Sequence, residues 1–122
     1  MFGMSPMDSE EMKRIHLATV KPSGSPHVVP VLALYYDGKI YFATDRHSVK
    51  VKNILNNNNV AAITSDGYRA TITEGKARIL SEEEVTNRIA DLFRDKHPWK
   101  PRFERGSTQV LVEIAPQKIM KI

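Results

Sequence analysis

Beyond the first fifteen residues, apolar and polar positions alternate or cluster in short stretches, which is typical of β-strands. Two such stretches are HLATV at 16–20 and HVVPVLALYY at 27–36, separated by a Lys-Pro-Ser-Gly turn sequence. The second stretch is followed by Asp37-Gly38 and then by KIYFAT at 39–44. An Asp-Gly pair between two β-rich stretches is among the strongest sequence signals for a two-residue hairpin. Three further strands are predicted, at 60–66, 68–80 and 110–122.

Three other segments carry helix signals. Residues 1–15 place acidic residues in a first turn and basic residues near the end, which complements a helix dipole. Residues 48–57, SVKVKNILNN, begin with Ser48, a favoured N-cap residue type. Ser81 followed by Glu84 matches a capping box. Apolar residues then recur with the spacing of an amphipathic helix, at Val85, Ile89, Leu92 and Phe93.

These elements predict a mainly β fold, a six-stranded antiparallel Greek-key barrel with about three short helices. A length of 122 residues corresponds to a single domain over 1–122. Within the strand at 68–80, the parity of the apolar positions changes near Glu74-Gly75, which indicates a β-bulge. In the last strand five apolar residues share one parity across Pro116, so we expect them to face one side: Val110, Val112, Ile114, Met120 and Ile122.

The run from Val28 to Tyr35 is apolar on both faces of its strand. An antiparallel strand with one face in water would alternate apolar and polar residues. We therefore expect one face to lie inside the barrel and the other to be covered by a second chain or a ligand. Pro30 has no N–H, so it should occupy a bulge or a locally unpaired position.

Composition narrows the chemistry that this chain can perform. The absence of cysteine excludes disulfides, thiolate metal sites, iron–sulfur clusters and cysteine nucleophiles. Eighteen basic and fourteen acidic side chains give a net charge of +4, which suits a phosphate-bearing partner, either nucleic acid or a small anionic cofactor. The four histidines lack metal-ligand spacing, so we predict no metal site. No apolar run approaches the ~20 residues of a membrane span and no secretory signal is visible, so a cytoplasmic location is expected.

The stretch TDRHSVKVKNIL, residues 44–55, is the most informative for chemistry. It places the hydroxyl of Thr44 at a strand end, the hydroxyl of Ser48 at a helix N-cap and Lys50 in the first turn. A helix N-terminus offers free N–H groups and a partial positive charge, so these side chains could form a phosphate site. An ordinary capped surface helix with solvated lysines has the same pattern.

A second basic segment, KHPWKPRFER at 96–105, interleaves Trp99 and Phe103 with lysine and arginine. Such a segment can stack on nucleic acid or cover a flat heteroaromatic cofactor. The simpler interpretation is a loop whose aromatic side chains plug the end of the barrel.

The ordered motifs of residues 17–63 resemble the pyridoxamine 5′-phosphate oxidase-like, FMN-binding split-barrel family. They comprise a Leu-Ala-Thr-Val strand, Gly-Ser-Pro-His-Val-Val-Pro-Val, an Asp-Gly hairpin, a strand ending in Thr, and Ser-Val-Lys at a helix start. The helix continues with Lys-Asn-Ile, and Asn-Asn-Val leads into the next strand. The later EGKARILSEEE also fits the family, so the resemblance extends over roughly residues 10–122.

This resemblance implies a homodimer with FMN at the subunit interface, and hydride or electron transfer to or from a small substrate. It implies that the strand Val29 to Leu34 lies along the flavin ring and ribityl chain, and that the hydroxyls and lysine described above approach the phosphate. The implied cofactor-binding residues are Val29, Pro30, Val31, Leu32, Thr44, Ser48, Val49, Lys50 and Ala70. No catalytic side chain is implied.

The chain also departs from the true pyridoxamine phosphate oxidases. Those enzymes carry basic side chains at the positions of Val29, Val49 and Leu34, which are aliphatic here. The difference favours a smaller or different substrate. Other members of the family use a deazaflavin coenzyme, so a deazaflavin-dependent reductase is an alternative, as is a non-enzymatic binder of flavin, heme or nucleic acid.

Overall fold

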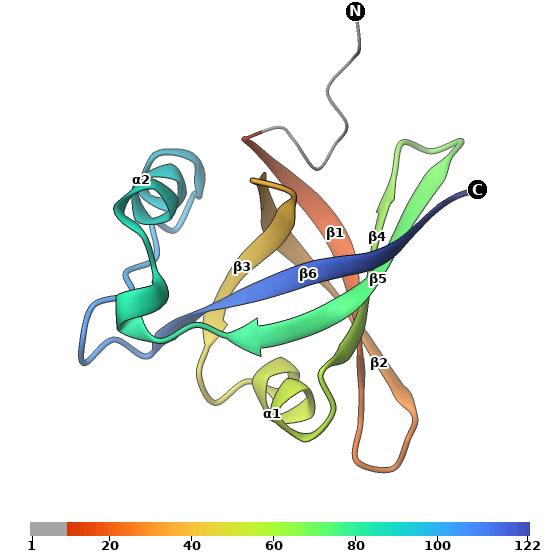
Figure 1. Cartoon of the computed structure of the whole chain (residues 1–122), viewed down its shortest axis with the longest axis horizontal. Coiled ribbons are helices and arrows are strands. Elements are labelled where there is room, and N and C mark those ends of the chain that lie inside the picture. The colour runs from red at the N-terminus through yellow and green to blue at the C-terminus, as the bar shows by residue number, and fades with distance from the viewer. Residues whose placement is uncertain (1–9) are drawn as a thin grey trace, which may run out of the picture.

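The computed structural model describes residues 10–122, which form six antiparallel strands closed into a barrel (Figure 1). The strands follow one another around the barrel in the order β1-β2-β3-β6-β5-β4. Their bounds are β1 Glu11–Val20, β2 Pro26–Tyr36, β3 Lys39–Asp45, β4 Asn59–Ser65, β5 Ala70–Ile79 and β6 Gln109–Lys121. Two α-helices, α1 Val49–Asn56 and α2 Asn87–Lys96, and a 3-10 turn, η2 Glu82–Glu84, complete the described chain. The predicted mainly β barrel is confirmed.

The β2–β3 hairpin forms as its sequence predicts. Tyr36 pairs with Lys39, so two residues form the turn between the strands. Asp37 has a φ of 52° and Gly38 a φ of 75°. Positive φ at both central residues is the geometry of a type I′ turn, whose twist matches that of the flanking strands.

The predicted N-terminal helix is wrong over its described part, because residues 11–15 belong to β1. Residues 1–9 of that prediction lie outside the described residues. The β1 strand pairs with β2 in unbroken register from Glu11–Tyr35 to Val20–Pro26. Its buried residues alternate at Ile15, Leu17 and Thr19. Pairing and burial of this alternating face outweigh the charge pattern that favoured a helix, since strand formation depends strongly on tertiary context.

The bulge occurs where the parity change predicted it, but the extra residue lies on β6. Gly75 pairs with Pro116 while Glu74 pairs with Lys118, so Gln117 is unpaired. Thr73, Gly75 and Ala77 all remain buried on one face of β5. The phase of β6 changes at the bulge instead, so the predicted shared face is wrong: Ile119, opposite Thr73, continues the face of Ile114. A Cβ at Gly75 would overlap the backbone of Ala115, so a glycine is required there.

Two apolar clusters lie on opposite faces of the barrel wall. The inner cluster fills the barrel with residues from all six strands and from α1, among them Ile15, Phe42, Ile54 and Ile114. The outer cluster lies beneath α2 and joins Leu34, Tyr41 and Leu111 to the helix, whose buried residues are Ile89, Leu92 and Phe93.

The helix α2 begins later than its capping-box signal predicts. Ser81 N–H donates to the Glu84 carboxylate at 2.9 Å, but this pair closes only the 3-10 turn η2. The hydroxyl of Thr86 caps α2 and accepts from the Ile89 N–H at 3.3 Å. The predicted amphipathic helix is confirmed over Ile89, Leu92 and Phe93, whereas Val85 precedes it.

The barrel is split at one end between β2 and β3. These strands pair only from Ala33–Phe42 to the hairpin, so the half of β2 from Pro26 to Leu32 pairs with β1 alone. The far end of β3 leads directly into α1, which lies across the same end of the barrel (Figure 1). This open end brings the first half of β2, the end of β3 and the start of α1 to one region.

Candidate functional site

Hydroxyl groups gather where β3 passes into α1. Ser48 is the N-cap of α1, and its Oγ accepts from the Val51 N–H at 3.3 Å, so the predicted cap is confirmed. Thr44, the second-last residue of β3, is largely buried, and its Oγ1 donates to the same Ser48 Oγ at 3.3 Å. Ser48 Oγ therefore accepts two hydrogen bonds and keeps its own proton for an incoming acceptor.

The first turn of α1 adds backbone donors and a cation. The N–H groups of Val51 and Lys52 are taken by the Ser48 side chain and carbonyl. Within the described residues, the N–H groups of Val49 and Lys50 have no such acceptor, as expected for the start of a helix. Lys50 is partly buried, and this burial lowers the pKa of its ammonium group. A negatively charged group at this position would satisfy both N–H groups and compensate the buried charge.

A buried hydrogen bond fixes α1 against the barrel. The Asn53 side-chain amide donates to Thr19 Oγ1 at 3.0 Å, and both residues are almost fully buried. This contact ties the helix to β1 and so holds its N-terminus at the end of β3. The sequence analysis did not assign Asn53 a role, because its partner lies 34 residues away. The only available signal was a polar residue on the apolar side of the helix.

The edge of β2 that faces the split carries free backbone groups. Tyr36 and Lys39 close a two-residue hairpin, and such a pair exchanges both of its backbone hydrogen bonds. Backbone direction alternates along a strand, so even-numbered residues of β2 direct their N–H and C=O groups toward the β3 side. Pro30 is one of these, and its missing N–H falls where β3 has diverged. Pro30 lies opposite His16 of β1 and has no partner on β3, so the predicted unpaired position is confirmed on the β3 side only.

The side chains of the same half-strand divide between two environments. Val29 and Val31 are partly buried, and Val31 packs against the cluster inside the barrel. On the outer face Val28 is 54% exposed, Pro30 is exposed and Leu32 is partly exposed. The expectation that the apolar run is covered on both faces therefore holds only from Ala33 to Tyr35 in one chain. Val28 was not among the predicted site residues, but it belongs to this open apolar face.

Ala70 lies away from the other predicted residues. It begins β5 next to the β4–β5 turn, opposite Ser65, whereas the α1 end of the same hairpin is at Asn59 and Lys76. At about 3.3 Å per residue, Ala70 is roughly 20 Å along β5 from that end. Within one chain it lines an open cavity of about 880 Å³ together with basic side chains, namely Lys13, Arg14, Arg69 and Lys121.

One buried carboxylate, Glu113, is present among residues 10–122, and it serves the outer face of the sheet. The Tyr41 hydroxyl donates to its Oε2 at 3.1 Å, and the Arg78 Nε donates to its Oε1 at 3.1 Å. These partners lie on the two strands that flank β6. Glu113 therefore cross-links three strands on this face.

The described residues also contain no group of three or more histidine, aspartate or glutamate side chains placed to hold a metal ion. None of their helices is long and apolar enough to cross a membrane.

Comparison with known families identifies the family of this chain. Residues 10–121 match the sequence profile of the pyridoxamine 5′-phosphate oxidase family. The chain belongs to that family. The match spans almost the whole chain, so the resemblance seen in the sequence motifs is confirmed.

Solved structures of similar fold agree with this family membership. A pyridoxamine 5′-phosphate oxidase-related, FMN-binding protein from Nostoc punctiforme aligns with a TM-score of 0.71 at 17% identity, covering 88% of this chain and 72% of that one. General stress protein 26 from Bacillus anthracis aligns with a TM-score of 0.71 at 26% identity, covering 92% and 85%. An F420 reductase aligns with a TM-score of 0.68 at 24% identity, covering 91% of each chain. No curated protein sequence matches.

Within this oxidase-family fold, the predicted residues fall into three groups. Thr44, Ser48, Val49 and Lys50 meet at the start of α1. Val29 to Leu32 lie at the same end of the barrel, in the half of β2 that has no β3 partner. Ala70 lies at the far end of the β4–β5 hairpin.

Proposed function

We propose that this chain is a single FMN-binding domain over residues 1–122 that acts in the cytoplasm as a homodimeric flavin-dependent oxidoreductase. The observation that carries the proposal is the group of donors at the start of α1. Two hydroxyls, two free backbone N–H groups and a partly buried lysine converge there, next to an open apolar strand edge. Family membership and the FMN-binding relative from Nostoc punctiforme support FMN as the ligand.

The residues present fit the phosphate of FMN. The hydroxyl of Ser48, the N–H groups of Val49 and Lys50, and the Lys50 ammonium would bind the phosphate oxygens, while Thr44 orients Ser48. Charged acceptors form the stronger class of hydrogen bond with such donors. Desolvation of Lys50 costs free energy in the empty site, and the phosphate would recover part of it.

The open half of β2 fits the remainder of the cofactor. The outward side chains of Pro30 and Leu32 offer an apolar wall to a flat ring, and the backbone edge of Val28 to Leu32 offers donors and acceptors to polar ring and ribityl atoms. Val29 and Val31 support this wall from inside the barrel. The bound flavin supplies hydride or electron transfer, and the chain binds, orients and shields it.

A homodimer would complete the site. The outer face formed by Val28, Pro30 and Leu32 is apolar and exposed in one chain, and contiguous exposed apolar surface marks an interaction site. Ala70 could then reach the cofactor from the second chain, since it lies at the opposite end of its own barrel. The substrate differs from pyridoxamine phosphate in this proposal, because Val29, Val49 and Leu34 provide no cation for a second phosphate.

The decisive experiment compares FMN with riboflavin, which has the same ring and no phosphate. A charge-assisted hydrogen bond contributes about 1.5–3 kcal/mol, so Lys50→Ala should weaken FMN binding roughly tenfold to a hundredfold. Riboflavin should bind weakly to the native chain and lose little further from the substitution. Lys52→Ala is the matched control, since Lys52 is exposed on the same helix; it should change FMN affinity less than about twofold.

Equal losses for FMN and riboflavin, or no loss for either, would overturn the phosphate site. The absorption spectrum and the mass of the cofactor released from purified protein test the ligand itself. Oxidised FMN gives a yellow protein, whereas a colourless protein that takes up no flavin contradicts the proposal. Trp99→Ala should raise the fluorescence of bound flavin if Trp99 covers the ring, because an aromatic side chain in contact with the ring quenches its emission.

A deazaflavin-dependent reductase is the second candidate, favoured by the likeness to an F420 reductase over 91% of both chains. The same α1 site would bind the phosphate of that coenzyme. Mass spectrometry of the cofactor and competition between the two coenzymes separate the candidates. A protein that binds either flavin or heme without reducing or oxidising any substrate would instead be a non-enzymatic carrier.

A further inference from the structure

The loop that follows α2 is held in a defined conformation. His97 is buried and stacks on Phe93 with ring centroids 5.9 Å apart. Its Nδ1 accepts a hydrogen bond from the backbone N–H of Trp99 at 3.1 Å. Lys100 adopts a left-handed conformation with φ of 47°, its N–H donates to the His97 carbonyl at 3.1 Å, and its Nζ donates to the Arg94 carbonyl at 2.8 Å. Pro98 and Pro101, which flank Trp99 and Lys100, restrict the backbone further.

The two aromatic residues of this loop have different surroundings. Phe103 packs edge-on against Phe93, with ring centroids 5.6 Å apart, and belongs to the outer cluster. The prediction that these aromatic side chains plug the end of the barrel is wrong, because Phe103 packs beneath α2 on the outer face of the barrel wall. Trp99 is 85% exposed, although its ring lies 5.3 Å from the His97 ring, centroid to centroid. An indole that is held in place and left in water is typical of ligand-contacting surfaces, where aromatic side chains dominate the binding energy.

A cavity of about 340 Å³ opens beside this indole. Its lining includes the small side chain of Ala43 on β3, Pro101, and the polar side chains of Arg102 and Gln109. The volume is at the lower end of the range for small-molecule sites, which suits a ligand with one or two rings. Ala43 packs against the outer cluster, whereas Thr44 shares the inward-facing parity of Phe42, so the cavity and the phosphate site proposed above lie on opposite faces of the end of β3.

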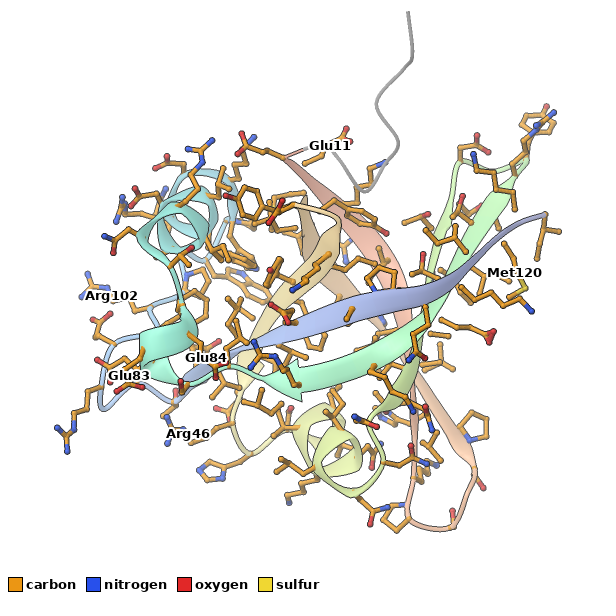
Figure 2. All side chains as sticks on the ribbon, viewed as in Figure 1. Glu11, Arg46, Glu83, Glu84, Arg102 and Met120 are labelled. Carbon is orange, nitrogen blue, oxygen red and sulfur yellow. The ribbon has the colours of Figure 1, made fainter. Side chains whose placement is uncertain are left out.

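The charges around the cavity favour an anion. Its lining contains Lys100 and Arg102 and no carboxylate. The guanidinium of Arg102 is exposed, and its ion pair is a loose one, with Glu104 at 3.7 Å. Figure 2 shows Arg102 on the α2 side of the molecule. The Gln109 side-chain amide makes no hydrogen bond to any of the described residues, so it remains available to a polar ligand group.

We propose that this cavity binds a planar aromatic carboxylate, stacked on Trp99 and paired with Arg102. If the chain is the flavin enzyme proposed above, this ligand would be its substrate, and that role rests on the proposed function. The binding itself does not require a flavin. A flat ring matches the exposed indole face, and the guanidinium forms a bidentate pair with a carboxylate.

Trp99 is the single tryptophan of the chain, so its indole N–H gives one signal in a nitrogen–proton correlation spectrum of isotope-labelled protein. The probes are benzoate, its neutral analogue benzamide, and cyclohexanecarboxylate, which keeps the charge and lacks the aromatic ring. Benzoate should shift the indole signal saturably and bind about tenfold more tightly than either analogue, because only benzoate supplies both contacts.

Arg102→Gln should reduce benzoate affinity about tenfold and leave benzamide affinity unchanged. Arg105→Gln is the matched control in the same loop, since Arg105 does not line this cavity; it should change benzoate affinity less than about twofold. The unchanged signals of the remaining residues report that each variant is folded. The inference would be overturned if benzoate did not shift the indole signal, or if benzoate and benzamide shifted it equally. Equal losses of benzoate affinity in the two arginine variants would also overturn it.

The titration is repeated with and without added FMN. FMN binding without benzoate binding overturns this inference and leaves the proposed function standing. Benzoate binding in a chain that binds no FMN supports the cavity and overturns the flavin function instead. A Trp99→Ala chain that becomes monomeric would place Trp99 in a contact between two copies and would also overturn the inference.

Discussion

The two halves of β2 are both mainly apolar, and they have different surroundings. In the half next to the hairpin, Leu34 is fully buried on the outer face of the barrel by α2. In the other half, Val28 is 54% exposed on the same face, and Leu32 is partly exposed. The strand also has β3 as a neighbour in the half next to the hairpin and lacks it in the other half.

The comparison separates stability from function along one strand. The covered half is completed by elements of its own chain and contributes to folding. The open half has an unsatisfied backbone edge and an uncovered apolar face, which are the features of an interaction surface.

Truncation of one leucine in each half gives the largest expected difference. Leu34→Ala should lower the free energy of unfolding by about 2–5 kcal/mol, the usual cost of removing a buried leucine. Leu32→Ala should cost less than about 1 kcal/mol in the monomer and weaken dimerisation or flavin binding instead. Urea denaturation of both variants measures the difference. Similar losses of stability would show that the open half belongs to the folding core.

A charge on the open half should affect assembly more than folding. The native chain should sediment at about twice its 13.8 kDa mass at micromolar concentration. Val28→Glu would bury an unpaired charge in the interface and should weaken the dimer about tenfold or more. Thermal unfolding at dilutions where both proteins are monomeric provides the control. A native chain that binds flavin normally as a monomer would contradict the interface.

The smallest expected effect is a pH dependence that arises at the end of α2, the helix that covers the hairpin half of β2. Burial lowers the pKa of His97 below 6.5, so the unfolded chain binds a proton more readily than the folded one. Stability should therefore be level above pH 6.5 and fall as the pH drops below it. Thermal unfolding of the native chain and of His97→Phe between pH 7.5 and 5.5 measures this loss of stability, which should be absent in the variant.

A second acid-sensitive group acts at lower pH and does not interfere. The Glu84 carboxylate accepts the Ser81 N–H and pairs with Arg78, and these contacts lower its pKa to about 2. Its contribution is present above the ordinary value of 4.5 and is lost below it. An unchanged pH dependence in His97→Phe would assign the effect to other groups.

Much of the fold was predictable from short-range signals. The Asp37-Gly38 turn and the Ser48 cap each depend on residues within three or four positions, and both formed as predicted. The N-terminal segment was misread because its strand is stabilised by pairing with β2, which lies up to 24 residues away in the register. The position of the bulge was correct, but its strand was not, since only the register of β5 with β6 shows which strand has the extra residue.

The same distinction applies to the candidate site. One group of predicted residues is close in sequence, so the motif alone predicted that they lie together at the start of α1: Thr44, Ser48, Val49 and Lys50. The link from Asn53 to Thr19 and the position of Ala70 depend on contacts between distant segments. The cavity beside Trp99 was not predictable, because it requires the loop after α2 to come together with β3 and β6.

By itself the sequence determined the elements whose energies are local: the hairpin turn, the helix cap, the amphipathic α2 and the family motifs. Only the tertiary structure decided which apolar positions are covered, because burial depends on which segments pack together and not on the hydrophobicity of any one of them. Leu34 and Val28 are equally apolar in sequence, and α2 reaches only the first.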